Sequence, residues 1–275
     1  MIARFYAPWS HARSGAVLVS RARAFEAAHA YRGPGFGHDR RIHGHNYVVT
    51  ATIAGEADPG TDVVADLRAI DPLLREVTDP LDHRRIDVEY APLAGREPGV
   101  EPLAVAIFGE LARAMRSALP QATLASVRVA ETDDLWADHD GGDHVELTRA
   151  YGFSAAHRLV RPDLSDAENT ALYGKCANPH PHGHDYRLEV TVAGQPDPAT
   201  GLVTDLAGLD RCVSERVLSR YDHRYLNAEV PPFDRVAPTG ERIAQEIWRS
   251  LAGLAGLARV TVYETPRSAF TYRGP

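Results

Sequence analysis

The chain has 275 residues, long enough for two compact domains, and its 44% hydrophobic residues can supply a core to each. A net charge of -7 argues against a nucleic-acid partner, and two cysteines without a paired spacing argue against a disulfide framework. The apolar run Val17 to Val19 is far too short for a signal core or a membrane span, so we expect a cytoplasmic protein that acts on a small molecule, with no membrane partner.

One pattern occurs twice along the chain. Four motifs recur in the same order: Phe25 to His29 as Phe153 to His157, His43 to Tyr47 as His182 to Tyr186, Asp82 to Arg84 as Asp222 to Arg224, and Val129 to Thr132 as Val262 to Thr265. We place repeat one at residues 16–140 and repeat two at 144–275, joined at the turn-forming stretch 138–142. The offset grows from 128 residues at the first motif to 139 at the second, so repeat two carries 11 extra residues, expected in a loop.

Each repeat shows the same sequence of expected elements: two strands, a helical middle and a final strand pair. In repeat two, residues 145–151 and 186–192 alternate in polarity as half-buried strands do, whereas 202–218 and 243–254 have apolar residues at helical spacing. This order predicts an α+β fold in which an antiparallel four-stranded sheet carries two helices on one face.

The His-Gly-His motif of repeat two predicts a metal site. Residues two apart in a strand point to the same face, so His182 and His184 can reach one ion, and His157 on the preceding strand can complete three ligands. Three imidazoles with an open fourth position are typical of catalytic zinc.

A single His-Gly-His is equally consistent with a strand fragment that carries two polar side chains, but its duplication with a matched upstream histidine favours metal binding. Repeat one offers His29, His43 and His45 in the same layout. The histidines without a matched partner are interpreted as solvated loop residues: His11, His38 and His180.

These motifs resemble the 6-pyruvoyl-tetrahydropterin synthase family, including its relative, the 6-carboxytetrahydropterin synthase of queuosine synthesis. In repeat two the resemblance runs through Phe153 to His157, Gly174 to Pro179, His182 to Tyr186, Tyr221 to His223 and Tyr263 to Thr265. It implies the tunnelling fold, in which subunits join their sheets into a barrel. Two tandem units of this kind imply a homo-oligomer with its sites at the seams.

The resemblance also implies roles for residues of repeat two. His157, His182 and His184 hold zinc, Cys176 is the catalytic thiol, Asp222 and His223 form a partner dyad, Glu264 anchors the pterin ring, and Thr239 at a helix start faces the substrate. Loss of triphosphate from a dihydropterin side chain requires a Lewis acid together with acid and base groups, which this set supplies. The alternatives are a buried packing role for Cys176, a helix-end ion pair for the dyad, a strand-end glutamate and a helix-capping threonine.

Repeat one departs from this pattern at the thiol. It keeps the dyad Asp82 and His83 and the anchor Glu131, but no cysteine lies between its first two triad histidines. Asp39, four residues before the His-Gly-His, stands there instead, and the Thr239 position becomes Gly99. An aspartate is a weaker base than a tuned thiolate, so repeat one either runs altered chemistry or, as we favour, binds metal and pterin without turnover.

We therefore predict a zinc lyase that converts 7,8-dihydroneopterin triphosphate to 6-pyruvoyl-tetrahydropterin in tetrahydrobiopterin biosynthesis, because Cys176 lies six residues before the His-Gly-His, as in the pyruvoyl-forming branch. A 6-carboxytetrahydropterin or side-chain-cleaved product is the alternative within this class. A non-catalytic pterin-binding module is the alternative outside it, and a zinc hydrolase is disfavoured because no glutamate base of the His-Glu-x-x-His type is present. Which repeat, or which neighbouring chain, supplies the dyad that faces the thiol stays open.

Overall fold

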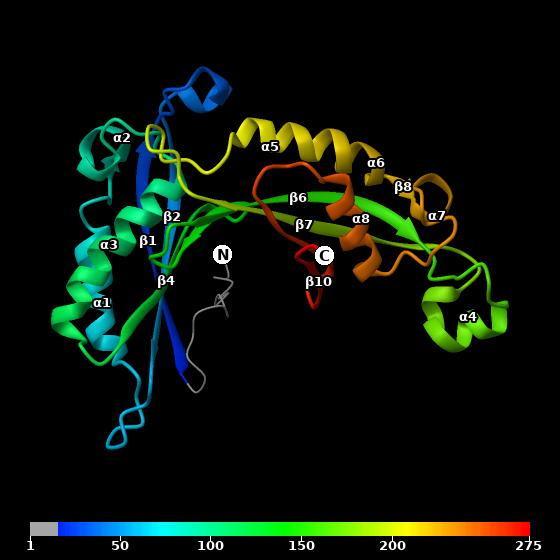
Figure 1. Cartoon of the computed structure of the whole chain (residues 1–275), viewed down its shortest axis with the longest axis horizontal. Coiled ribbons are helices and arrows are strands. Elements are labelled where there is room, and N and C mark those ends of the chain that lie inside the picture. The colour runs from blue at the N-terminus through cyan, green and yellow to red at the C-terminus, as the bar shows by residue number, and fades with distance from the viewer. Residues whose placement is uncertain (1–15) are drawn as a thin grey trace. The chain divides into compact units, whose positions relative to one another are not determined.

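The computed structural model describes residues 16–275, which form two compact units (Figure 1). Unit 1 comprises the chain up to residue 148 together with residues 193–205, and unit 2 comprises residues 149–192 and 206–275. A segment of the second repeat is thus part of the first unit. Among the described residues, no helix is long and apolar enough to span a bilayer.

Unit 1 is built on a sheet with the strand order β3-β1-β2-β4-β5. Its strands are β1 (Val17–His29), β2 (His43–Gly55), β3 (Arg84–Arg85), β4 (Thr123–Thr132) and β5 (Leu135–His139). The four long strands pair antiparallel, and the two-residue β3 pairs parallel with β1. Alternation of buried and accessible residues along β2 follows from this pleat, since one face covers the core.

The helices of unit 1 pack on this sheet and on each other. They are η1 (Pro34–Arg40), α1 (Leu67–Thr78), α2 (Ile86–Glu89), η2 (Ala91–Leu93) and α3 (Val100–Ala118). Helix α1 contacts β1 and α3 contacts β4 and β5, while the two helices also contact each other. Fully buried apolar side chains of both layers form the core, among them Ile53, Ile70, Leu74, Leu103 and Ile107.

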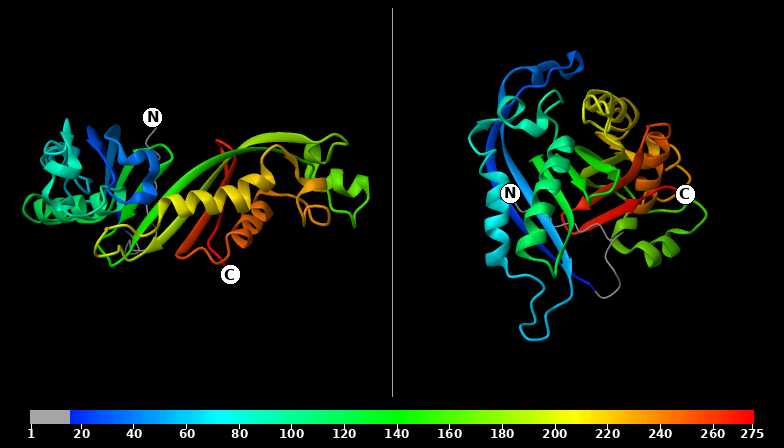
Figure 2. Two further views of the ribbon diagram at one scale, coloured as in Figure 1. Left: turned by 90° about the horizontal axis from the view of Figure 1, so that it is seen from above. Right: turned by 60° about the vertical axis from the view of Figure 1, so that its left-hand side comes forward.

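Unit 2 repeats this plan with the strand order β10-β9-β7-β6, and β8 pairs parallel with β6. Its strands are β6 (Val145–His157), β7 (His182–Gly194), β8 (Arg224–Tyr225), β9 (Leu257–Thr265) and β10 (Ser268–Tyr272). Its helices are α4 (Asp166–Tyr173), η3 (Gly174–Ala177), α5 (Leu206–Val213), the π-helical η4 (Ser214–Leu218), α6 (Ser219–Tyr221), α7 (Leu226–Glu229) and α8 (Gly240–Ser250). Figure 2 shows α5 and α8 on the same side of the strands.

The mixed α+β architecture predicted from the sequence is confirmed, and the sheet of each unit is open. The 11 extra residues of repeat two were expected in a loop, and this prediction is wrong, because this part of the chain folds into α4. The Ser165 hydroxyl caps α4 by accepting a hydrogen bond from the Glu168 amide. The Glu168 carboxylate in turn accepts a hydrogen bond from the Ser165 amide. The helix expected over 202–218 begins only at Leu206.

Candidate metal centres and catalytic groups

The three imidazoles of unit 1 are brought together by strand register. His29 at the end of β1 pairs with His43 at the start of β2, and Ala27 pairs with His45, so all three histidines share one face. The same face carries Tyr47 deeper in the sheet. The three ligand atoms lie within 4.8 Å of one another, and the Nε2 atoms of His29 and His43 are 3.0 Å apart.

Unit 2 builds the same centre from β6 and β7. The ligand atoms of His157, His182 and His184 lie within 4.8 Å of one another, and the Nε2 atoms of His157 and His182 are 3.1 Å apart. The glycine between the two strand histidines is required for this approach, because a Cβ on Gly183 would stand 3.0 Å from the carbonyl oxygen of Ala155.

Backbone carbonyls orient the imidazoles. The Nδ1 of His29 donates to the Pro98 carbonyl at 3.0 Å, and the Nδ1 of His157 donates to the Pro238 carbonyl at 2.9 Å. The Nδ1 of His43 has the Arg41 carbonyl as its partner at 2.7 Å. With the proton held on Nδ1, the lone pair on Nε2 is available to an ion, as in many metal sites.

Both centres contain a buried nitrogen that a metal ion would satisfy. The Nε2 atoms of His45 and His184 are buried, and neither has a hydrogen-bond partner among the described residues. The Nε2 atoms of the other two histidines in each centre lie 3.0 to 3.1 Å apart, and all three ligand atoms are within 4.8 Å of one another. The donor sets therefore fit a divalent metal bound by three imidazoles.

Burial favours the neutral form of two imidazoles in each triad. It lowers the pKa of His29 and of His157 to about 4 in each case, although the carbonyl partners act in the opposite direction. Burial also lowers the pKa of His45 and His182, and the neighbouring imidazole lowers each further. The neutral form is the one that binds metal, so both triads are ready for an ion at neutral pH.

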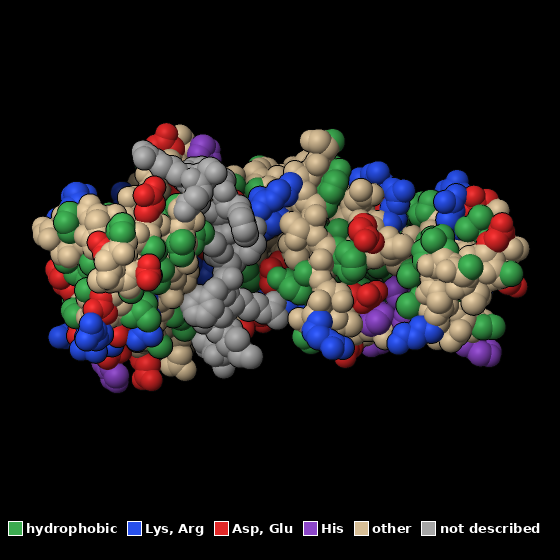
Figure 3. Space-filling view, turned by 90° about the horizontal axis from the view of Figure 1, so that it is seen from below, with side chains coloured by type: hydrophobic (Ala, Val, Ile, Leu, Met, Phe, Trp, Pro, Cys, Tyr) green, Lys and Arg blue, Asp and Glu red, His purple; other side chains and the backbone are tan. Residues whose placement is uncertain are grey.

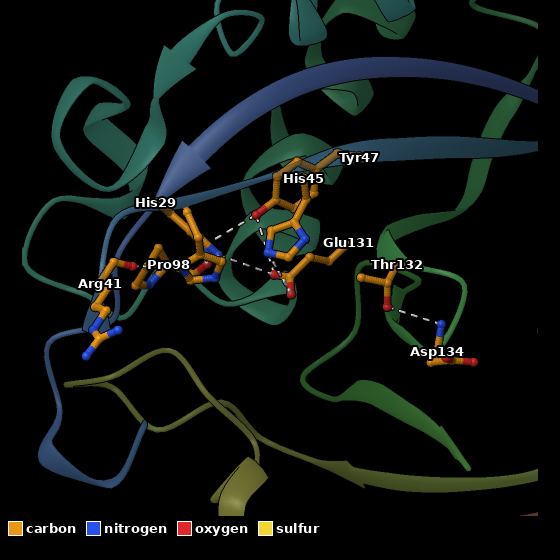
Figure 4. A network of polar contacts seen from close by, with 9 residues as sticks. His29, Arg41, His45, Tyr47, Pro98, Glu131, Thr132 and Asp134 are labelled. Carbon is orange, nitrogen blue, oxygen red and sulfur yellow. Dashed lines mark hydrogen bonds and ion pairs between the residues drawn. The ribbon is translucent and has the colours of Figure 1, made fainter. Parts of the chain in front are cut away.

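A glutamate lies against each triad. In unit 1, the carboxylate oxygens of Glu131 lie 3.5 Å from the Nε2 of His45 and 3.8 Å from that of His29, and the hydroxyl of Tyr47 donates to Glu131 at 3.4 Å (Figure 4). In unit 2, an oxygen of Glu264 lies 3.5 and 3.6 Å from the Nε2 atoms of two triad histidines. The predicted pterin anchors thus border the metal centres.

Cys176 and Asp39 occupy equivalent places in their repeats. The carbonyl of Cys176, on η3, accepts a hydrogen bond from the Leu159 amide at 2.9 Å. The carbonyl of Asp39 accepts one from the Tyr31 amide at 3.0 Å, and both amides lie two residues after the first triad histidine. The Cys176 thiol is half-buried, whereas Asp39 is exposed. Asp39 is therefore the structural counterpart of Cys176, although the two lie four and six residues before their His-Gly-His motifs.

Each predicted dyad is fixed to the edge of a strand. Asp222 accepts from the Ser154 amide at 2.9 Å and lies 3.0 Å from the Nδ1 of His223, whose side chain is 82% exposed. In unit 1, Asp82 accepts from the Glu26 amide at 2.9 Å and lies 3.0 Å from the Nδ1 of His83. These backbone contacts lower the pKa of both aspartates, with the histidine as a further cause. The partners of each dyad are strand residues rather than the thiol.

An open hollow of about 470 Å³ lies beside the dyad of unit 2, over β6, β7 and β8. His223 and His184 both line it, together with residues of β6 and β7. In the space-filling view, histidine side chains reach the surface beside acidic ones in the right-hand half (Figure 3).

The remaining predicted residues are also placed. The Thr239 hydroxyl accepts from the Arg242 amide at 3.4 Å and caps α8, and Gly99 begins α3 without a side-chain cap. His38 and His180 are exposed, as expected, while His11 lies outside the described residues.

Sequence reasoning missed groups that act through the backbone. The carbonyls of Pro98 and Pro238 are such groups, and no sequence signal identifies an acceptor of this kind beyond the repeated proline itself. Glu97 was also missed: its carboxylate accepts from the amides of Arg32 and Gly33 at 2.8 and 3.0 Å, and it holds the start of the loop that carries Asp39.

Fold and sites together define a class of protein: an α+β chain of two similar repeats, each with a three-imidazole centre suited to a divalent metal. A family model described as 6-pyruvoyl tetrahydropterin synthase matches residues 18–142 and again residues 146–275. The chain belongs to this family, as a tandem duplication.

Individual relatives cover one repeat's length of the chain. The 6-pyruvoyl tetrahydrobiopterin synthase of Homo sapiens is 43% identical over 132 residues, which are 47% of this chain and 91% of that protein. The protein of the same name from Poecilia reticulata is 42% identical over 131 residues, 46% of this chain and 89% of that one. A solved structure of Caenorhabditis elegans 6-pyruvoyl tetrahydropterin synthase is 41% identical, covers 48% of this chain and 96% of that chain, and has a TM-score of 0.47.

Proposed function

We propose that the chain is a zinc-dependent 6-pyruvoyl-tetrahydropterin synthase-like lyase that acts on 7,8-dihydroneopterin triphosphate, mainly in repeat two. The observation that carries the proposal is the three-imidazole centre of unit 2, which has a buried unpartnered nitrogen on His184 and a carboxylate, Glu264, beside it. Relatives named 6-pyruvoyl tetrahydrobiopterin synthase, at 42% and 43% identity, support the substrate.

His157, His182 and His184 would hold the ion, which when bound supplies a Lewis acid for the side-chain hydroxyls of the substrate. Glu264 accepts hydrogen bonds from the aminopyrimidine edge of the pterin, because a carboxylate offers two oxygens to two N–H donors. Glu264 lies 3.5 Å from the Nε2 of His157, so a pterin ring held by this carboxylate would lie beside the residues that would hold the ion.

Cys176 and a dyad histidine move the protons. In the dyad, Asp222 holds the Nδ1 of His223, which leaves Nε2 to exchange a proton with the substrate or the thiol. The Cys176 thiol is half-buried rather than packed away in the core, so a substrate or a proton-transfer partner can reach it.

The working site is completed by another repeat, from the same chain or from a second copy. Two facts support this: the dyad histidines project into solvent from strand edges, and their hydrogen-bond partners are strand residues rather than Cys176. In this arrangement, repeat one binds metal and pterin without turnover and lends its dyad to repeat two. The homo-oligomer expected from the family provides the required neighbours.

Incubation of the purified chain with 7,8-dihydroneopterin triphosphate tests the function. We expect release of triphosphate and a product with the mass of 6-pyruvoyl-tetrahydropterin. A product with the mass of 6-carboxytetrahydropterin would instead support the alternative activity. A putative 6-carboxy-5,6,7,8-tetrahydropterin synthase of Archaeoglobus fulgidus is 28% identical to this chain. Tight pterin binding without release of triphosphate would instead indicate a non-catalytic binding module.

A further inference from the structure

Within unit 1, residues 193–205 pack on the start of α3. The Thr200 carbonyl accepts from the Glu97 amide at 2.9 Å, and the Glu101 carboxylate accepts from the Val203 amide at 3.3 Å. The side chain of Leu202 fills the space above Gly99: a Cβ on that glycine would stand 2.6 Å from the Leu202 Cδ2. Glu101 is only 3% exposed as a result.

Repeat one contains a second copy of this segment, residues 56–66, with the same local structure. Asp197 accepts hydrogen bonds from the amide and the hydroxyl of Thr200 at 2.8 and 3.1 Å. Asp58 accepts the same pair from Thr61 at 3.0 and 3.1 Å. Because the same turn is held by the same bonds, the two segments present their following residues in the same way.

The counterparts of the residues in this contact are accessible at the tip of the repeat-one segment and at one side of the start of α8, although Gly240 on that turn is buried. Val63, the counterpart of Leu202, is 45% exposed. Glu241, the counterpart of the buried Glu101, is exposed in the first turn of α8. Leu202 of repeat two is half-buried and Glu101 of repeat one is buried, whereas their counterparts, Val63 of repeat one and Glu241 of repeat two, are both exposed.

The contact residues differ between the repeats in a compensating way. Where Leu202 lies on Gly99, the corresponding pair is Val63 and Thr239, so a smaller apolar side chain is matched to a larger residue on the helix. Leu202 in place of Val63 would leave no room for the Thr239 side chain.

A second pair compensates by charge. A Cβ on Gly201 would stand 2.9 Å from the Cβ of Pro102, so these two residues are in contact in unit 1. Their counterparts are Asp62 and Arg242, which carry opposite charges and are both accessible. Asp62 also shares the left-handed backbone of Gly201, with φ of 56° against 79°.

We propose that residues 56–66 of one chain dock on the first turn of α8 of a second copy of the chain, as residues 193–205 dock on α3 within unit 1. Val63 lies on Thr239, Asp62 pairs with Arg242, and the Val64 amide donates to Glu241. Each chain offers one such segment and one such helix start, so the contact is head-to-tail and repeats from chain to chain. Because the residues of each pair match only each other, residues 56–66 fit α8 better than α3, and residues 193–205 fit α3 better than α8.

The charge pair gives the test, read by sedimentation of the full chain over a range of concentrations. Arg242→Glu places a glutamate opposite Asp62 and should raise the dissociation constant at least about tenfold. Adding Asp62→Asn removes the repulsion and should recover most of the association, because asparagine tolerates the positive φ. A glutamate three residues after Thr239 also suits the helix start, so the fold should hold.

Arg249→Glu is the matched control, since Arg249 lies on the same helix and contacts the same Glu246 as Arg242 does. It should leave association unchanged. A steric pair provides an independent test: Val63→Leu should weaken association and Thr239→Gly in the same chain should restore it. A parent protein that stays monomeric, an Arg242→Glu variant that associates like the parent, or a double variant without recovery would each overturn the proposal.

Discussion

The two repeats build the same three-imidazole centre and differ in the groups around it. In both, three imidazoles meet at the end of a strand pair, and a carboxylate lies within 3.8 Å of them. At the position next to the first triad strand, however, unit 2 has Cys176 and unit 1 has Asp39. The difference teaches that strand register preserves a ligand set, whereas the loops that hold reactive groups can change without disturbing it.

The repeats also differ at the helix that follows. The start of α3 is covered by residues 193–205 and buries Glu101, whereas Glu241 at the same place on α8 is exposed. The two repeats therefore differ in whether the first turn of this helix is covered by another segment of the chain.

Removal of a metal ligand should separate the repeats most strongly. His184→Ala should reduce bound zinc from about two ions per chain to about one and abolish turnover, because two imidazoles bind weakly. His45→Ala should lose the other ion and keep most of the turnover. Elemental analysis and a triphosphate-release assay check this, and a zinc-free variant that still turns over would exclude the metal mechanism.

The thiol comes next. Cys176→Ala should lower turnover by about 10²- to 10⁴-fold, the range of a lost acid–base group, and leave pterin binding intact. Asp39→Ala should keep most of the activity. Steady-state kinetics with a binding titration measure both effects, and equal losses in the two variants would show that repeat one is a second working site.

The dyads test which repeat serves the thiol. If repeats alternate around the assembly, His83→Ala should cost on the order of 100-fold in turnover and His223→Ala much less. Both side chains are exposed, but both residues have a positive φ of 57° and 56°, which alanine tolerates less well than histidine, so the unfolding temperature of each variant is measured as the control. A fully active His83→Ala beside an inactive His223→Ala would rule out the alternating arrangement.

The smallest effect concerns the buried glutamate of α3. Burial raises the pKa of Glu101 from 4.5 to about 7, so the folded chain holds a proton that the unfolded chain releases between those values. The free energy of unfolding should therefore fall as pH rises from about 4.5 to 7, by up to about 3 kcal/mol. Glu101→Gln should lack this fall. Urea denaturation of parent and variant at pH 5 and pH 8 measures it, and parallel curves would contradict the burial of the carboxylate.

The metal centres were largely predictable because they depend on spacing. His182 and His184 are two apart in a strand, and the repeat identified His157 as the third member without knowledge of the sheet register. A period of two survives any change in neighbouring loops, so this inference needed no structure.

Other features depend on tertiary contacts or on signals that were overlooked. Counting back from the His-Gly-His gives different positions for Cys176 and Asp39, and only their shared carbonyl contacts show that they correspond. The capping box of Ser165 and Glu168 was visible in the sequence and would have placed α4. The delayed start of α5 follows from Leu202, which packs on Gly99 instead of continuing a helical stripe.

The dyad of unit 1 restricts where a further strand can pair with the edge strand β1. The Glu26 amide donates to Asp82, the Glu26 carbonyl accepts from the His83 amide at 2.6 Å, and β3 pairs with Ala27 and Ala28. These bonds use the outer edge of β1 at its carboxyl end, so this stretch cannot template an added strand. A strand that extends the sheet can pair only with the part of β1 before Glu26. The dyad loop thereby acts as a stop that limits both edge-to-edge aggregation and the register in which any neighbouring strand can join.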